Sequence, residues 1–192
     1  MNQQETSLDK RPAIFIDRDG TLNLEVGYLH RPEDVIITPG AAGWIACLNK
    51  KNIPSIVITN QSGIGRGSFC WNDYYAVTKK IDELLAKENA LLDDQYACPF
   101  HKDGIGKYRH PNHPDRKPNP GMLLKAAKKH CIDLERSWMI GDKEIDLEVA
   151  RNAGCRSALV LTGYGRSVNP QLADIVADDL GKAIERILSI GL

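Results

Sequence analysis

The sequence predicts an α/β fold in which an open, parallel β-sheet lies between two layers of helices. Short, nearly all-apolar runs rich in branched side chains alternate with longer segments whose apolar residues recur at helical spacing. Strands buried on both faces of a parallel sheet have this composition, and the intervening helices cover the two faces. The 192 residues, 42% hydrophobic and 26% charged, suit one compact globular domain.

Each predicted element follows from its pattern. Five short apolar runs are predicted strands, at residues 12–17, 54–59, 137–142, 157–162 and 175–177. Five segments of helical periodicity are predicted helices, at residues 41–51, 71–89, 120–130, 145–153 and 180–190. We expect Asn119 to cap the third helix and Gly154 to end the fourth. Residues 98–118 lack periodicity and predict a long irregular loop.

Composition narrows the possible partners. Lys+Arg and Asp+Glu are both 25, so no net positive field exists to attract a nucleic-acid backbone. No apolar run approaches the roughly 20 residues that cross a bilayer, and the polar start lacks the features of a secretory signal. Five scattered cysteines predict free thiols. We therefore expect a polar leader at residues 1–11, a single domain at 12–192, and a cytoplasmic monomer that binds neither membrane nor nucleic acid.

Two acids follow the first predicted strand, in the run Asp17-Arg18-Asp19-Gly20-Thr21. Ligands of open α/β sheets bind beyond the carboxyl ends of the strands, so these acids are candidates for chemistry. An Asp carboxylate can attack phosphorus, and a second acid two residues away can donate and recover a proton. The alternative is an Asp-Gly turn with solvated acids.

A second acidic pair, Asp142 and Asp146, follows another predicted strand. Mg2+ prefers a few carboxylate and carbonyl oxygens together with phosphate and water. Asp17, Asp142 and the backbone carbonyl of Asp19 would supply such a set. Asp146 lies one helical turn after Asp142, and it is either a further metal ligand or a capping acid.

Polar neutral residues end the second predicted strand. Thr59, Asn60 and Gln61 offer a hydroxyl, two amides and backbone N–H groups, which suit phosphate oxygens. Three glycines follow at a spacing that differs from the dinucleotide-binding fingerprint, and we expect them to form a flexible turn: Gly63, Gly65 and Gly67.

Two cations, Arg116 and Lys117, precede the third predicted helix. A lysine there can neutralise the charge on a transferring phosphoryl group, and a guanidinium can hold a second phosphate or sugar hydroxyls. The alternative is that Arg116 and Lys117 are an ordinary pair of solvated surface residues. We also expect Arg18 and Lys143 to contact the substrate phosphate.

The order of these pieces resembles the haloacid dehalogenase (HAD) superfamily of phosphohydrolases from Ala13 to about Thr162. The resemblance implies a Rossmann-like sheet and a magnesium-dependent phosphatase. It implies that Asp17 is the nucleophile that forms an aspartyl-phosphate and Asp19 the general acid and base. It further implies that Thr59 and Lys117 bind phosphate and that Asp142 binds magnesium. The segments between these residues are too short for a large cap domain.

The runs FIDRDGTLN, VITNQSGIGRG, RKPNPGML and MIGDKEID are similar to those of the D-glycero-D-manno-heptose 1,7-bisphosphate 7-phosphatases and the related histidinol-phosphatase domains. The resemblance favours a sugar bisphosphate of the heptose pathway, which supplies lipopolysaccharide, as substrate. The alternatives are histidinol phosphate, another small metabolite, a nucleic-acid end, and a non-catalytic phosphate-binding protein.

This subgroup usually holds zinc in the loop before the RKP run through CxH and CxC pairs. Here that loop contains Cys98-Pro99-Phe100-His101 and His113-Pro114-Asp115. A weak zinc site could use Cys98, His101 or His110, His113 and Asp115. A set with one cysteine binds zinc less firmly than thiolate pairs, so we expect a loop held by packing. By the same analogy residues 23–32, with Glu25, Tyr28, His30 and Arg31, form the opposite wall of the pocket.

Overall fold

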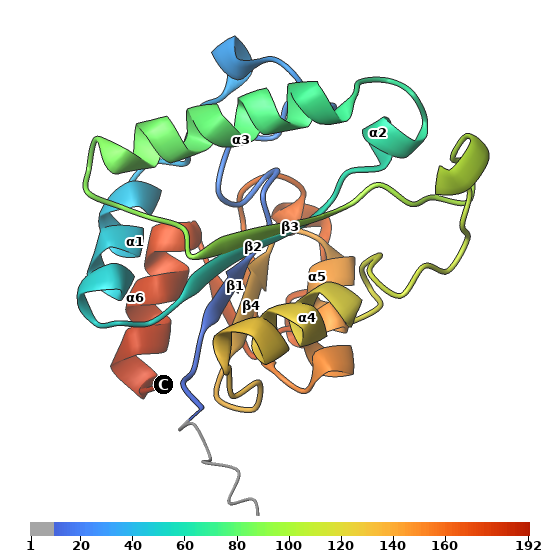
Figure 1. Cartoon of the computed structure of the whole chain (residues 1–192). Helices are drawn as coiled ribbons and strands as arrows, with labels where there is room; N and C mark the ends of the chain where they lie inside the picture. Colours follow the sequence, from blue (N-terminus) through green and yellow to red (C-terminus); the bar gives the residue numbers. More distant parts are fainter. Residues whose placement is uncertain (1–9) are drawn as a thin grey trace, which may run out of the picture.

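Six parallel strands form one open sheet in the order β3-β2-β1-β4-β5-β6 (Figure 1). The structure is a computed structural model that describes residues 10–192. The strands are β1 (Ile14–Ile16), β2 (Ser55–Asn60), β3 (Asp94–Cys98), β4 (Trp138–Gly141), β5 (Arg156–Val160) and β6 (Ile175–Ala177). The helices are α1 (Ala41–Lys50), α2 (Ser62–Gly65), α3 (Trp71–Ala86), α4 (Gly121–His130), α5 (Glu144–Ala153) and α6 (Leu180–Ile190).

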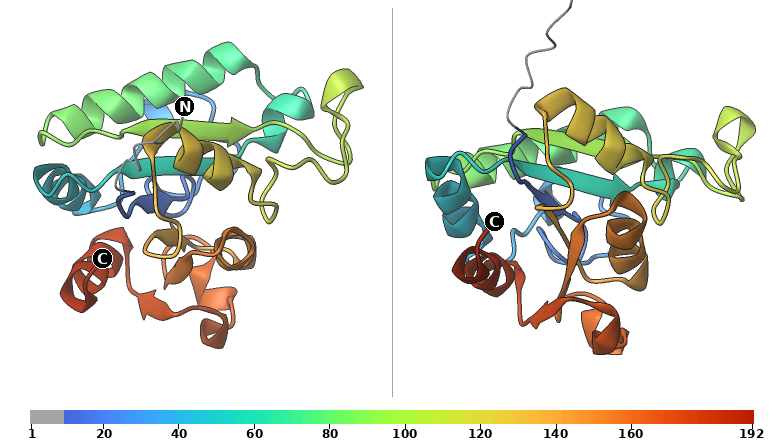
Figure 2. Two further views of the ribbon diagram at one scale, coloured as in Figure 1. Left: turned by 60° about the horizontal axis from the view of Figure 1, so that its bottom comes forward. Right: turned by 90° about the horizontal axis from the view of Figure 1, so that it is seen from below.

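The helices cover both faces of the sheet, which confirms the predicted three-layer fold (Figure 2). Successive residues of β1 point into different cores, because the side chains of a strand alternate between the two faces of the sheet. Ile14 and Ile16 pack in one core with apolar residues of α1, α3 and α6. Phe15 packs in the other core with residues of α4 and α5. Strands β1, β2 and β4 are buried on both sides, so their sequences are almost continuously apolar.

The edge strand β3 is a difference from the sequence-based prediction, which assigned no strand to its residues. Its sequence, DQYAC, lacks an apolar run, and four of its five residues are only partly buried. It pairs with β2 in register from Ile56 with Asp94 to Asn60 with Cys98. An edge strand has a neighbouring strand on one side only, and its side chains are less buried. Its sequence therefore lacks the continuous apolar run that marks a central strand.

Two helix ends also differ from prediction. The expected cap at Asn119 is wrong: Pro120 occupies the N-cap position of α4 without a side-chain cap. The Asn119 amide instead donates to Asn112 Oδ1 and to the carbonyl of His113. Helix α3 ends at Ala86 rather than at Asn89, because Asn89 has a φ of 57°.

Of the glycines after β2, Gly67 lies in a turn with a φ of +74°, whereas Gly63 and Gly65 do not form the flexible turn expected for them. Residues Ser62–Gly65 form the short helix α2, and Gly63 and Gly65 are buried. A Cβ atom on Gly65 would lie 2.1 Å from the Pro99 carbonyl oxygen, and one on Gly63 would lie 2.1 Å from the Phe69 ring. These glycines therefore allow close packing of α2 against its neighbours.

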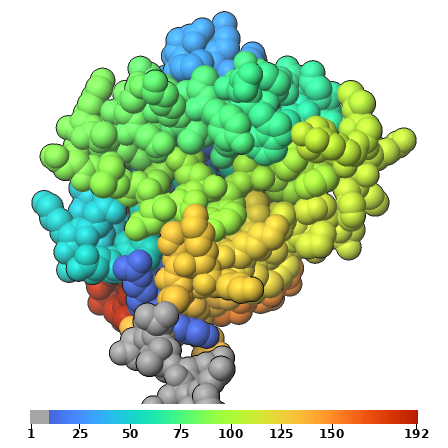
Figure 3. Space-filling view, viewed as in Figure 1, coloured from blue at the N-terminus to red at the C-terminus, as the bar shows by residue number. Residues whose placement is uncertain are grey.

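The residues between the site motifs form the sheet, the helices packed on it, and loops, so residues 10–192 contain no large cap domain. The loop between β3 and α4 lies at the right-hand edge of the face in Figure 3, coloured yellow-green. Residues 1–9 of the expected leader lie outside the described residues, and Arg11 already bonds with the backbone of Cys131 and Asp133. Within residues 10–192 no helix is both long and apolar enough to cross a membrane.

A matched pair of glycine variants tests the packing of α2. Gly65→Ala should lower the free energy of unfolding by about 1–3 kcal/mol, because the new methyl group meets the Pro99 carbonyl. Gly43→Ala in α1 has ordinary space around its Cβ and should raise stability by about 0.5 kcal/mol. Urea unfolding followed by circular dichroism measures both values. Equal effects of the two substitutions would contradict the packing argument.

Candidate active site

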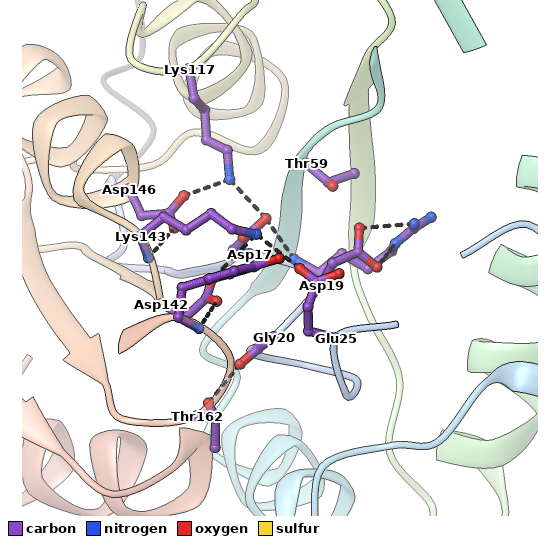
Figure 4. Close-up of polar contacts among 12 residues, drawn as sticks. Asp17, Asp19, Gly20, Glu25, Thr59, Lys117, Asp142, Lys143, Asp146 and Thr162 are labelled. Atoms are coloured by element: carbon purple, nitrogen blue, oxygen red, sulfur yellow. Dashed lines mark hydrogen bonds and ion pairs between the residues drawn. The ribbon is translucent and has the colours of Figure 1, made fainter. Parts of the chain in front are cut away.

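Three carboxylates meet beyond the carboxyl ends of neighbouring strands (Figure 4). Asp17 follows β1 and Asp142 follows β4, which is paired with β1. Asp146 lies in the first turn of α5. Oxygens of all three lie within 4.8 Å of one another, and no other group of this kind occurs in residues 10–192. The structure thus brings together the acids that the sequence placed at separate strand ends.

Lys117 reaches this cluster from the loop before α4. Its Nζ lies 2.8 Å from Asp17 Oδ1 and 2.6 Å from Asp146 Oδ1, and it donates to the carbonyl of Ile58. Only 2% of the residue is exposed, so the alternative of a solvated surface lysine is wrong. Although burial opposes ionisation, the charges of Asp146 and Asp17 raise the pKa of Lys117. The ammonium therefore balances part of the buried negative charge.

Asp142 is the acid of the cluster that Lys117 does not contact. Burial raises its pKa to about 7, and the charge of Asp17 adds to this effect. Asp142 Oδ2 accepts the backbone N–H of Tyr164, whereas Oδ1 is buried, has no hydrogen-bond partner in the described part of the chain, and lies 3.8 Å from Lys143 Nζ. Hard oxygen ligands are what Mg2+ requires, and a buried carboxylate oxygen without a hydrogen bond beside Asp17 fits such an ion.

Asp146 occupies the capping position that the sequence left open. Its Oδ2 accepts the backbone N–H of Lys143 at the start of α5, while Oδ1 is held by Lys117. Burial and the charge of Asp17 raise the pKa of Asp146, and Lys117 opposes this shift. Both oxygens of Asp146 therefore accept hydrogen bonds, whereas only Oδ2 of Asp142 does so within residues 10–192.

Asp19 is oriented by neighbouring side chains. The Arg18 guanidinium donates two hydrogen bonds to its carboxylate, at 3.0 and 2.9 Å, and Gln61 Nε2 donates a third at 2.9 Å. Arg18 is only 1% exposed and lies over the Tyr74 ring. The structure therefore places the Arg18 side chain on Asp19 rather than in the substrate pocket, while its backbone N–H donates to Asp17 Oδ1.

The residues that end β2 support the site from the side. Asn60 forms two hydrogen bonds of 3.1 Å with the backbone N–H and carbonyl of Lys117, so its amide fixes the path of that chain. The Thr59 hydroxyl oxygen accepts Gln61 Nε2 at 2.8 Å. The side chains of Asn60 and Gln61 are thus already engaged with the protein, although both residues line the adjacent pocket.

A pocket of about 330 Å³ opens beside Asp19 and is lined by loops from several strand ends. Lys143 lies at its edge, with Nζ 3.1 Å from Glu25 Oε2 and 4.8 Å from the centre of the Tyr164 ring. Although burial opposes ionisation, Asp17, Asp142 and Glu25 raise the pKa of Lys143. Glu25 and Tyr28 of the loop predicted as a wall do line this pocket. Tyr164 was not predicted, because its contacts with Lys143 and Asp142 join segments that are distant in sequence.

Arg116 lies outside the residues that line this pocket. Its Nη1 donates to the carbonyl of Phe100, and burial lowers the pKa of the guanidinium. It thereby holds the loop that follows β3, which leads toward Lys117.

The residues considered for zinc do not form a ligand cluster in residues 10–192. Burial raises the pKa of the Cys98 thiol to about 11, which disfavours the thiolate that zinc needs. His113 stacks on Phe100 with ring centres 3.7 Å apart, His101 lies against Arg66, and Asp115 pairs with Lys125. Packing and ion pairs therefore order this loop.

The ion pairs of Lys117 can be tested by substitution. Lys117→Met should lower the free energy of unfolding by about 3–5 kcal/mol in magnesium-free buffer, because Asp17 and Asp146 are left buried without a cation. The control Lys182→Met removes an exposed ion pair with Glu185 and should leave stability nearly unchanged, because water screens such a pair. Denaturant unfolding measures both. A Lys117 variant as stable as the control would show that the buried pairs contribute little.

Comparison with known proteins agrees with this geometry. A HAD-hydrolase-like family model matches residues 115–183. A D-glycero-D-manno-heptose-1,7-bisphosphate 7-phosphatase from Thermosynechococcus vestitus is 42% identical over 187 residues, covering 92% of this chain and 95% of the relative. The D-glycero-beta-D-manno-heptose-1,7-bisphosphate 7-phosphatase of Escherichia coli is 38% identical over 184 residues, covering 91% and 94%.

A solved structure is similarly close. The D,D-heptose 1,7-bisphosphate phosphatase from B. bronchiseptica, crystallised with magnesium and phosphate, superposes with a TM-score of 0.83 at 32% identity, covering 94% of this chain and 99% of that one. The relatives match nearly the whole chain. The chain therefore belongs to the haloacid dehalogenase-like phosphatases, in the family of the heptose-1,7-bisphosphate 7-phosphatases.

Proposed function

We propose that this protein is a magnesium-dependent phosphatase that removes the 7-phosphate of D-glycero-D-manno-heptose 1,7-bisphosphate. The observation that carries the proposal is the contact of Lys117 with Asp17 beside an oxygen of Asp142 that has no hydrogen bond, next to a pocket of about 330 Å³ that Asp19 and Lys143 help to line. The names of the relatives supply the substrate. An aspartate beside a fixed ammonium and a metal-binding carboxylate is suited to phosphoryl transfer.

The first step is attack by Asp17. Lys117 and the Arg18 backbone N–H both bind Oδ1 of Asp17, which orients the carboxylate and leaves its second oxygen to attack phosphorus. The P–O bond to the sugar breaks as the Asp17–phosphorus bond forms, and Asp19 donates a proton to the leaving oxygen. Asp19 then takes a proton from water, which attacks the aspartyl-phosphate and releases phosphate.

Asp17, Asp142 and the Asp19 carbonyl would hold the Mg2+ ion. When bound, the ion would reduce the repulsion between the Asp17 carboxylate and the incoming phosphate. This chain's own contribution is the arrangement of charge: Lys117 is buried between two acids, and one oxygen of Asp142 accepts no hydrogen bond within residues 10–192. Zinc is not part of the proposal.

The reacting phosphate would be bound by Lys143, Thr59, Asn60 and Gln61. Asn60 and Gln61 would contact it chiefly through their backbone groups. Arg116 would hold the second phosphate of the bisphosphate. Its partner in this structure is a backbone carbonyl, so its charge remains uncompensated by a carboxylate.

We propose that the protein works as a monomer in the cytoplasm, without a membrane or nucleic-acid partner. Its five cysteines, all among the described residues, are free thiols, as is usual in a reducing compartment. Its formal net charge of zero gives no general attraction to polyanions.

A substrate panel tests the activity. With Mg2+, the protein should release one phosphate per molecule of heptose 1,7-bisphosphate, at a higher kcat/KM than from histidinol phosphate. Asp17→Asn should lower kcat by a factor on the order of 10³ or more, because the nucleophile is lost. The control Glu33→Gln alters an exposed acid and should leave kcat unchanged. Equal rates for the two variants, or a preference for histidinol phosphate, would contradict the proposal.

The role of Arg116 is tested by comparing two substrates. Arg116→Ala should raise KM for the bisphosphate by roughly 10- to 100-fold, the value of a charge-assisted hydrogen bond, but change KM for heptose 7-phosphate much less. Arg109→Ala, in the same loop and exposed, is the control and should affect neither. A similar rise in KM for both substrates would assign Arg116 a purely structural role.

A further inference from the structure

The segment that follows β5, Thr162-Gly163-Tyr164, lies directly on the Asp142 carboxylate. The Tyr164 backbone N–H donates to Asp142 Oδ2 at 2.8 Å. The two oxygens of Asp142 are therefore in different situations, because Oδ1 is buried and has no hydrogen bond within residues 10–192, with Lys143 Nζ 3.8 Å away. The N–H decides which oxygen remains available for an ion.

Gly163 makes this contact possible. Its φ is +51°, and a Cβ atom built on it would lie 2.1 Å from Asp142 Oδ2 and 2.8 Å from the Cα atom of Gly20. Neither distance is possible for a real side chain, so any other residue would push the segment away from Asp142 or turn the carboxylate.

Thr162 connects the segment to the catalytic loop after β1. Its Oγ1 donates to the carbonyl of Gly20 at 2.6 Å, as Figure 4 shows. Gly20 follows Asp19 directly, so this bond fixes the segment against the loop that carries Asp17 and Asp19. The three consecutive residues thus link two loops that each supply a proposed magnesium ligand.

We infer that the segment Thr162-Gly163-Tyr164 positions a magnesium ligand. The Tyr164 backbone N–H holds Asp142 Oδ2, and the segment thereby directs Asp142 Oδ1 to the ion. The inference rests on the magnesium site of the proposed function. Residues that hold a metal ligand in place commonly change metal affinity by 10- to 100-fold when they are altered.

Calorimetric titration of the whole protein with Mg2+ alone tests the inference. Gly163→Ala should raise the Kd for Mg2+ by roughly 10- to 100-fold. Gly40→Ala is the matched control, because Gly40 also has a positive φ, of +77°, yet its Cβ would meet nothing within 4 Å. This control has the same kind of backbone strain without the contact at Asp142, and its Kd should equal that of the unaltered protein.

A second pair covers the case in which Gly163→Ala does not fold. Thr162→Val keeps the shape of the side chain but removes the hydrogen bond to Gly20, and should raise the Kd by about fivefold. Thr162→Ser keeps the hydroxyl and should restore most of the affinity. Thermal unfolding without metal monitors folding of each variant.

Unchanged Mg2+ affinity in a folded Gly163→Ala or Thr162→Val variant would overturn the inference, as would an equal loss in Gly40→Ala. These results do not depend on turnover. If the unaltered protein bound Mg2+ but hydrolysed no substrate, the proposed function would fail while the expected changes in Kd still supported the positioning role.

Discussion

The buried cluster of Asp17, Asp142 and Asp146 is the constraint around which the rest of the site is arranged. Three carboxylates within 4.8 Å of one another repel each other strongly where little water is present. One buried ammonium, that of Lys117, contacts two of them, whereas one oxygen of Asp142 has no hydrogen bond and lies 3.8 Å from Lys143 Nζ. Burial and the charge of Asp17 raise the pKa of Asp142 to about 7, so its ionised form is destabilised in the empty cluster. A divalent cation would stabilise that ionised form, so the same feature that destabilises the empty cluster suits it to bind magnesium.

Backbone and amide contacts maintain this arrangement from several sides. Asn60 fixes the chain at Lys117, Gln61 and Arg18 hold Asp19, and the Tyr164 N–H holds Asp142. Polar residues next to the reacting groups are thus occupied mainly with orienting other side chains. A fixed charge arrangement of this kind favours phosphoryl transfer because little reorganisation is needed during the reaction. The pocket beside Asp19 is lined by residues of several loops, among them Lys143 and Glu25.

Most of the fold and the acids of the site could be predicted from local sequence. The central strands are nearly all apolar because both of their faces are buried, and the chemistry follows at their carboxyl ends. The edge strand β3 could not be predicted, since its half-exposed residues show no such pattern. The glycines of α2 were misjudged for a related reason: Pro99, which makes Gly65 necessary, is distant in sequence.

Sequence alone therefore determined the parallel three-layer fold and the identity of Asp17, Asp19 and Asp142 as candidates, because apolar runs and acid spacing are local properties of the chain. For Lys117, the order of the motifs and the resemblance to the HAD superfamily supplied the role, whereas its own neighbours in sequence left a surface lysine possible. Tertiary structure decided what each polar group contacts. It turned Arg18 toward Asp19, engaged Asn60 with Lys117, and brought Tyr164 to Asp142. Some of these contacts join residues of different loops, and others depend on the direction in which a side chain points. Each of them forms only when the strands assemble side by side.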